Sequence, residues 1–204
     1  MALHSSSQSV TSIYRCFYAI RFSPEVVDYL WTLMGELAAH GANVRWVARR
    51  NLHLTLRFLG DLSEPQYRRA LEFEPGRLTI SDVRIRAEGL GAFPTLRAPR
   101  VIWSGVSGET AESMDHVRSL QKRAERHSGA IGLPAEKRSW TPHVTLARVG
   151  SAAPGLRRLV DDITTRECLS PLCLIDAVVL MQSTLSQAGA EYRVVREWRI
   201  GSSE

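Results

Sequence analysis

The sequence predicts an α+β fold built mainly on antiparallel sheets. Strand-like and helix-like segments are interspersed along the 204 residues, and links of hairpin length occur beside crossover helices. A glycine-rich phosphate loop between the first strand and a helix is typical of a doubly wound parallel sheet, and this sequence has no such loop. Its absence favours the antiparallel class. No linker between residues 60 and 130 divides the chain, so residues 13–204 are expected to form one two-lobed unit.

The first half of the chain carries clear element signals. Residues 1–12 are serine-rich and without periodicity, which predicts a flexible tail. An aromatic and β-branched run predicts a strand at 14–22, and Ser23-Pro24 begins a helix that ends at Gly41. Further elements expected here are strands at 44–47 and 52–59, the latter closed by Gly60-Asp61, and a short helix from Ser63 to Pro75.

The second half alternates in the same way. The pattern predicts strands at 78–88 and 100–105, a helix at 109–127, a loop at 129–139, a strand at 143–149, a helix at 154–165, and a final hairpin of 172–185 with 191–200. The glycines of Gly89-Leu90-Gly91 are a weak signal and indicate a turn at 89–94.

Composition narrows the class of protein. Hydrophobic residues make up 44% and charged residues 23%, which is ordinary for a globular domain. No apolar run is long enough for a membrane span, and no secretory signal is visible. The three cysteines show no C-x-x-C spacing, which predicts reduced thiols in a cytoplasmic protein without membrane association.

The positive charge of the chain is nearly all arginine. The formal net charge is +5, and all but two of the 26 basic residues are arginines. A guanidinium offers a planar fork of donors that suits phosphate, which allows a polyanionic ligand. The alternative is that most of these arginines are ordinary solvated surface residues, because a positive net charge indicates only non-specific attraction to anions.

Two strand segments share the signature H-x-T-L. The first is His53-Leu54-Thr55-Leu56 and the second is His143-Val144-Thr145-Leu146. Two such matches by chance are roughly a one-in-a-thousand event for a chain of this composition. Either histidine alone would suggest a structural residue, whereas the duplication indicates a functional pair.

Strand geometry gives the repeated signature a physical meaning. Alternate side chains share a face, so His53 and Thr55 point together and the intervening leucines anchor the opposite face. Facing each other, the two strands would form a symmetric site of two imidazoles and two hydroxyls. One imidazole can act as general base and the other as general acid, while threonine hydroxyls and a guanidinium hold phosphate oxygens. No carboxylate lies at metal-ligand spacing beside either histidine, so in-line attack at phosphorus without metal or cofactor is expected.

The chain resembles the 2H phosphoesterase superfamily, and within it the RNA 2′,3′-cyclic phosphodiesterases, also called 2′–5′ RNA ligase-like proteins. Besides the two signatures, the resemblance rests on segments that run in order along almost the whole chain: Val44–Val47, Asn51–Gly60, Leu90–Pro94, Pro99–Trp103, Thr141–Arg148 and Leu185-Ser186.

The resemblance implies a two-lobed fold with pseudo-twofold symmetry and outer helices. It implies hydrolysis of an RNA terminal 2′,3′-cyclic phosphate to a 2′-phosphomonoester, with His53 as the acid and His143 as the base. Thr55, Thr145 and Arg148 would bind phosphate oxygens. Strict alternation, however, puts Arg148 on the face opposite His143, so the strand must bend or end there.

Other residues and functions stay open at this point. Phe93 and Trp140 can stack on a base or belong to the core, and Arg57 can line the groove or pair with a carboxylate. Alternative functions are 2′–5′ RNA ligation, opening of a small cyclic nucleotide, and a non-catalytic RNA-binding module. RNA with a cyclic phosphate end is the expected partner, with nucleotides as further ligands, and a monomer is the expected state.

Overall fold

The computed structural model describes residues 13–76, 83–150, 154–186 and 189–200. The tail predicted at 1–12 and the beginning of the strand predicted at 78–88 lie outside these residues. Nine strands are described: β1 (Tyr14–Arg21), β2 (Val44–Trp46), β3 (His53–Leu62), β4 (Arg84–Phe93), β5 (Val101–Gly108), β6 (His143–Val149), β7 (Cys173–Leu174), β8 (Ala177–Ser186) and β9 (Gly189–Arg199). The helices are α1 (Pro24–Ala38), α2 (Glu64–Ala70), α3 (Ala111–Ala130) and α4 (Leu156–Thr165), with a short 3-10 turn η1 (Arg49–Asn51) before β3.

All the strands join one antiparallel sheet. Its order is β7-β4-β5-β6-β3-β1-β8-β9, and β2 pairs with the last residues of β6, on the edge that faces away from β5. The boundary between β6 and β3 divides this order into two halves of four strands each. Two residues, Ile175 and Asp176, separate β7 at one edge from β8 in the other half, so the sheet must curl back on itself. The expected α+β class with two lobes and antiparallel pairing is confirmed.

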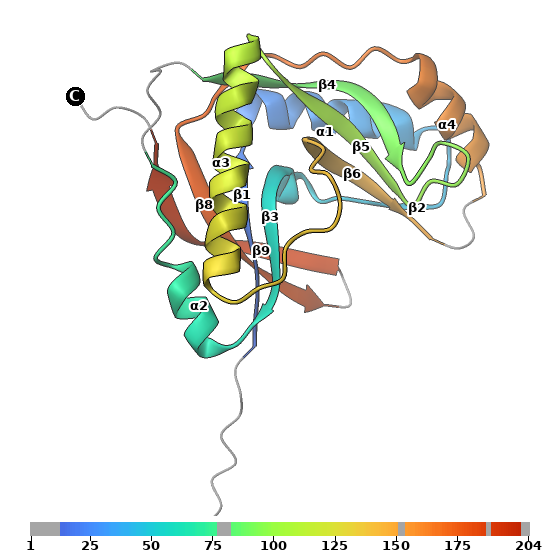
Figure 1. The fold of residues 1–204 in the computed structure, drawn as a ribbon. Coiled ribbons are helices and arrows are strands. Elements are labelled where there is room, and N and C mark those ends of the chain that lie inside the picture. The colour runs from blue at the N-terminus through green and yellow to red at the C-terminus, as the bar shows by residue number, and fades with distance from the viewer. Residues whose placement is uncertain (1–12, 77–82, 151–153, 187–188, 201–204) are drawn as a thin grey trace, which may run out of the picture.

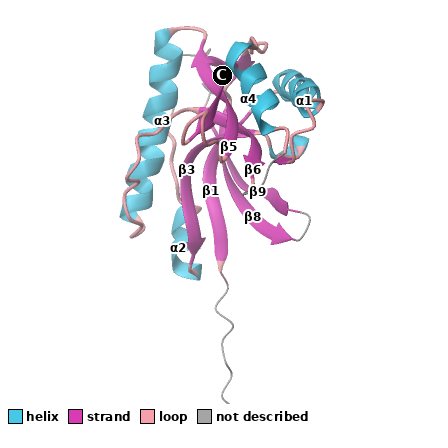
Figure 2. Cartoon of the chain, turned by 90° about the vertical axis from the view of Figure 1, so that its right-hand side faces the viewer, coloured by secondary structure: helices cyan, strands magenta, loops and turns pink. Residues whose placement is uncertain are grey.

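The helices lie outside the strands. Figure 2 shows α2 and α3 to one side of the sheet and α1 and α4 to the other, and Figure 1 shows α3 running alongside β3 and β1. The inner face of α1 is apolar and buried (Val26, Leu30, Leu33, Met34 and Leu37). Helix α2 begins with a capping box in which Ser63 and Gln66 satisfy each other's backbone groups, and the Thr110 hydroxyl caps α3 by accepting from the Ser113 amide.

The predicted turn at 89–94 is wrong. Strand β4 continues through it to Phe93, because Gly89 is an extra residue opposite β5 and takes a φ of +71° that glycine tolerates. Gly91 also lies inside the strand: a Cβ there would stand 2.4 Å from the Trp103 ring. The two glycines therefore mark a bulge and a close packing contact.

Other boundaries shift for similar reasons. Strand β3 passes the predicted stop at Gly60-Asp61 and reaches Leu62, again with a positive φ at Gly60. The strand predicted at 172–185 is interrupted at Ile175 and Asp176, where the chain leaves β4 and enters the other half of the sheet. Helix α4 begins at Leu156 rather than at Pro154, because Gly155 has left-handed backbone.

The apolar core lies under the repeated signature. Leu54, Leu56, Val144 and Leu146 are all buried in one large cluster with the inner faces of the helices. The three cysteines are buried and not in disulfides. Within the described residues, no helix has the length and apolar character that a membrane crossing requires.

Candidate active site

The two H-x-T strands are hydrogen-bonded neighbours at the centre of the sheet. They are joined at a single register position, Leu54 opposite Val144. Cross-strand partners share a face, so both of these side chains point into the core, where each is fully buried. The histidines and threonines on either side of them must then share the other face, and all four are partly buried there. We call this surface of β3 and β6, carrying His53, Thr55, His143 and Thr145, the histidine face.

The His53 ring is held at both nitrogens. Nδ1 lies 2.6 Å from the carbonyl oxygen of Asn51, two residues earlier, and Nε2 lies 2.9 Å from the Thr55 hydroxyl. A carbonyl oxygen can only accept, so Nδ1 carries the proton and donates it. In the neutral ring, Nε2 is therefore the acceptor, and the Thr55 hydroxyl donates to it.

His143 repeats this arrangement in the second half. Its Nδ1 lies 2.7 Å from the carbonyl oxygen of Thr141, again two residues earlier, so the same tautomer is present. A hydrogen bond of this kind orients the ring and sets which nitrogen is basic. Both histidines thus keep Nε2 as the nitrogen available for proton transfer.

Burial and charge shift both histidines in the same direction. The pKa of His53 is lowered to about 4, mainly by desolvation and to a smaller extent by charge on His143 and Arg148, while the hydrogen bond to the Asn51 carbonyl acts in the opposite direction. Desolvation is also the largest cause that lowers the pKa of His143, followed by the charge of Arg148. Both rings are neutral in the ligand-free site at neutral pH, and an anion beside them would favour protonation.

A bulge brings Arg148 to the histidine face. Trp103 of β5 is paired with Thr145 and the preceding Ile102 with Ala147, so Leu146 is an extra residue in β6. Leu146 and Ala147 are both buried, and the alternation resumes with Arg148 exposed. The bend that the sequence required for Arg148 is therefore present, and its charge acts on both histidines.

A corresponding bulge in β3 takes Arg57 away from the histidine face. Thr55 pairs with Ala19 and Arg57 with Tyr18, which leaves Leu56 as the extra residue. Of the two roles left open for Arg57, the structure has the carboxylate pairing and not the groove, because the side chain is 7% exposed and lies on the α3 side of β3. Its guanidinium contacts the carboxylates of Glu125 at 2.9 Å and Glu136 at 3.4 Å.

Phe93 and Trp140, the aromatic residues predicted beside the site, have different surroundings. Phe93 meets the His143 ring edge to face at a centroid distance of 5.0 Å. Trp140 donates its indole N–H to the carbonyl oxygen of Thr55 at 3.0 Å and packs against the core. Its contacts hold the motif strand in place, which favours a core role for Trp140.

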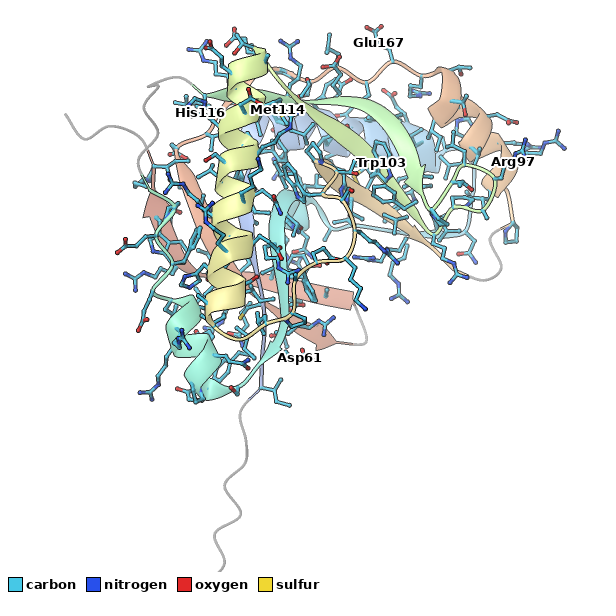
Figure 3. All side chains as sticks on the ribbon, in the orientation of Figure 1. Asp61, Arg97, Trp103, Met114, His116 and Glu167 are labelled. Carbon is cyan, nitrogen blue, oxygen red and sulfur yellow. The ribbon has the colours of Figure 1, made fainter. Side chains whose placement is uncertain are left out.

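Three further aromatic residues border the histidines and were not found from the sequence. Phe17 stacks on His53 at 4.8 Å, and Tyr192 meets the same ring edge to face at 5.4 Å. Trp103 lies 6.3 Å from His143, and Figure 3 shows it on β5 well inside the outer rim of the molecule. Phe17 and Trp103 lie in predicted strands, but their proximity to the histidines depends on strand order, which the sequence pattern does not contain.

The histidine face combines two basic nitrogens, two hydroxyls and one guanidinium. This set can supply an acid, a base and donors to an anionic centre. Within the described part of the chain, no three or more His, Cys, Asp or Glu side chains are grouped so that they could hold a metal ion.

Comparison with known proteins identifies the family of the chain. A family profile described as LigT like Phosphoesterase matches residues 20–103 and 109–192, one match on each side of the gap before α3. A protein of Aeropyrum pernix named RNA 2′,3′-cyclic phosphodiesterase is 35% identical, with 87% of this chain and 98% of the relative covered. A protein of the same name from Aquifex aeolicus is 34% identical, over 77% of this chain and 82% of the relative.

Solved structures share the fold. The crystal structure of TT0787 of Thermus thermophilus superposes with a TM-score of 0.70 at 27% identity, covering 93% of this chain and all of the other. Apo LigT of E. coli, at 22% identity, superposes with a TM-score of 0.68 over 94% of this chain and all of its own.

The fold and the family match define a two-lobed phosphoesterase of the 2H class. The chain belongs to the LigT-like phosphoesterase family, and the predictions that it is a 2H phosphoesterase and an enzyme are confirmed.

Proposed function

We propose that this protein hydrolyses the 2′,3′-cyclic phosphate at the end of an RNA strand to a 2′-phosphomonoester, acting as a monomer in the cytoplasm without a metal ion. The observation that carries the proposal is the matched pair of histidines. Both donate Nδ1–H to a backbone carbonyl, and both present Nε2 on one face beside Arg148. The names of the relatives from Aeropyrum pernix and Aquifex aeolicus supply the substrate class.

His143 acts as the base and His53 as the acid. His143 Nε2 takes a proton from water, and the water oxygen forms a new bond to phosphorus as the bond from phosphorus to O3′ breaks. His53, protonated at Nε2, gives its proton to O3′, which leaves as a hydroxyl. The phosphate stays on O2′, and each histidine ends in the protonation state opposite to the one in which it began.

The substrate helps to charge the acid. With a pKa of about 4, His53 is neutral in the free site at neutral pH. A phosphodiester monoanion beside Nε2 favours the imidazolium, because an opposite charge at short range stabilises it. Protonated His53 can then donate toward the leaving oxygen.

Hydroxyls and the guanidinium hold the phosphate. Thr55, Thr145 and Arg148 donate to the non-bridging oxygens, on which negative charge builds in the transition state. Arg148 can form a bidentate fork with two of these oxygens. Phe93, beside His143, is our candidate for contact with the terminal base.

Hydrolysis in the presence of a chelator tests the proposal. An oligonucleotide ending in a 2′,3′-cyclic phosphate is incubated with the protein in excess EDTA, beside His143→Ala and the matched variant His116→Ala. His116 lies on α3, on the opposite side of that helix from Trp103 in Figure 3. We expect full activity for wild type and His116→Ala and almost none for His143→Ala. Loss of activity in EDTA with rescue by a divalent ion would contradict the metal-independent mechanism.

A further inference from the structure

Arg45 is a second arginine beside the histidine face. It is the middle residue of β2, which pairs with the last residues of β6 on the edge away from β5, and it lies directly opposite Arg148. Cross-strand partners in an antiparallel pair share a face and their Cβ atoms lie close together. Because the bulge at Leu146 puts Arg148 on the histidine face, Arg45 lies on the same face, on the strand next to β6.

The pair of arginines is unfavourable without an anion. Like charges directly opposite each other in a sheet repel. Among the described residues, nine other arginines form ion pairs with carboxylates (Arg15, Arg21, Arg49, Arg50, Arg57, Arg68, Arg118, Arg166 and Arg199), but no carboxylate pairs with Arg45 or Arg148. An anion between the two guanidiniums would remove this repulsion.

A pocket lies beside the two arginines. Its volume is about 400 Å³, and it is lined by Asn43, Val44, Arg45, Arg148, Val149 and Gly150. The lining holds two cations, an amide and no acid, which is the composition expected for an anionic group. Arg148 belongs both to this pocket and to the histidine face, so the pocket adjoins the site.

We propose that Arg45 and this pocket bind a second phosphate of the substrate, the phosphodiester on the 5′ side of the terminal nucleoside. The inference rests on the proposed function and adds a substrate preference to it. An RNA strand that ends in a cyclic phosphate must continue on its 5′ side, and its next charged group is that phosphodiester. The enzyme should therefore prefer strands over cyclic mononucleotides.

Three substrates isolate the charge of this second phosphate. They are adenosine 2′,3′-cyclic phosphate, the dinucleotide ApA with the same cyclic end, and that dinucleotide with an uncharged methylphosphonate linkage. For wild type, we expect kcat/KM on the natural dinucleotide to exceed that on the other two about tenfold, the effect of one charge-assisted contact. Arg45→Gln should lose this difference and change the mononucleotide rate less than twofold.

Arg126→Gln is the matched control, because Arg126 is exposed on α3 and its replacement makes the same change in net charge. It should keep the tenfold preference. The dependence of log KM on log salt for the dinucleotide should become shallower by about 0.7 in Arg45→Gln alone, as expected for one lost contact to a single strand.

The outcomes separate this inference from the proposed function. Hydrolysis of the mononucleotide with no preference for the charged dinucleotide would overturn the inference and leave the function intact. Equal losses on mononucleotide and dinucleotide in Arg45→Gln would also overturn it. If no substrate is hydrolysed, the proposed function fails. In that case the affinities of the same three compounds are compared by calorimetry. Equal affinities for all three would overturn the second phosphate site.

Discussion

Leu54 of β3 lies directly opposite Val144 of β6, and this pair alone joins the two motif strands. Counting outward from it in an antiparallel register brings His53 toward Thr145 and Thr55 toward His143. Each strand then bulges at the leucine of its signature, Leu56 or Leu146. The pseudo-twofold axis of the site therefore passes through a buried apolar contact. This contact, on the core face of the two strands, sets the position of both histidines on the other face.

The two histidines should act as one unit. We expect His53→Ala and His143→Ala each to lower kcat about 100-fold to 10,000-fold, the range for a general acid or base. The double variant should be little slower than either single variant, because one missing partner already disables the coupled proton transfers. Steady-state rates for the three variants check this, and fully multiplicative losses would show that the histidines act independently.

The pH profile of kcat/KM should be bell-shaped with its maximum below pH 6.5. Activity requires one protonated and one neutral histidine, and kcat/KM reports the free enzyme. The pKa of His53 is about 4 and that of His143 is also lowered, so both limbs lie on the acid side. The profile of kcat should lie at higher pH, because the bound phosphodiester raises both values. Identical profiles would contradict this electrostatic account.

The lowered pKa of His53 also predicts a loss of stability in acid. Its pKa falls from 6.5 to about 4 on folding, so the unfolded chain takes up the proton first. The contribution of His53 to the free energy of unfolding is therefore constant above about pH 6.5 and decreases as the pH falls toward 4. Between pH 8 and pH 5, wild type should lose about 2 kcal/mol more unfolding free energy than His53→Gln. Urea titrations at both pH values measure this, and equal losses in the two proteins would show that His53 is not desolvated.

The threonine hydroxyls should act in the transition state. Thr55→Val and Thr145→Val keep the β-branched shape and remove only the hydroxyl, so kcat should fall more than KM rises. The melting temperature should stay close to that of wild type, because the histidine face is only partly buried and water can replace the Thr55 hydroxyl at His53 Nε2. A lowered melting temperature with unchanged kinetics would instead make these threonines structural.

Arg148 and Arg57 should respond in opposite ways to the same substitution. Arg148→Lys cannot form a bidentate fork on phosphate, and we expect normal folding with a loss of about tenfold in kcat/KM, or about 1.4 kcal/mol. Arg57→Lys should keep kcat/KM and lower the melting temperature, because the guanidinium contacts Glu125 and Glu136 behind the sheet. Thermal melts and kinetics on both variants decide this. The reverse pattern would show that the bulges at Leu56 and Leu146 are assigned incorrectly.

The histidines could be predicted from sequence because their signature is local and repeated. Alternation alone places His53 with Thr55 and His143 with Thr145, and the structure keeps both pairs together. Alternation misplaces Arg57 because a bulge at Leu56 shifts all later residues to the other face. A bulge depends on how a strand pairs with its neighbour, and here the neighbour of β3 is β1, far away in sequence.

The surroundings of the site could not be predicted for the same reason. Phe17 borders His53 because β1 pairs with β3, and Tyr192 borders it across a curled sheet. The glycines at 89 and 91 predict a turn by composition, although they allow a bulge and the close approach of Trp103. These contacts depend on strand order and packing rather than on the pattern of any one segment.

The position of the phosphate in the product tests the central claim most directly. The cyclic-ended ApA dinucleotide is hydrolysed in excess EDTA, and the product is identified by phosphorus NMR beside synthetic 2′- and 3′-phosphate standards. With His53 protonating O3′, the account predicts the 2′-phosphomonoester alone from wild type and almost no product from His53→Ala. A product ending in a 3′-phosphate, or no hydrolysis by wild type, would contradict it.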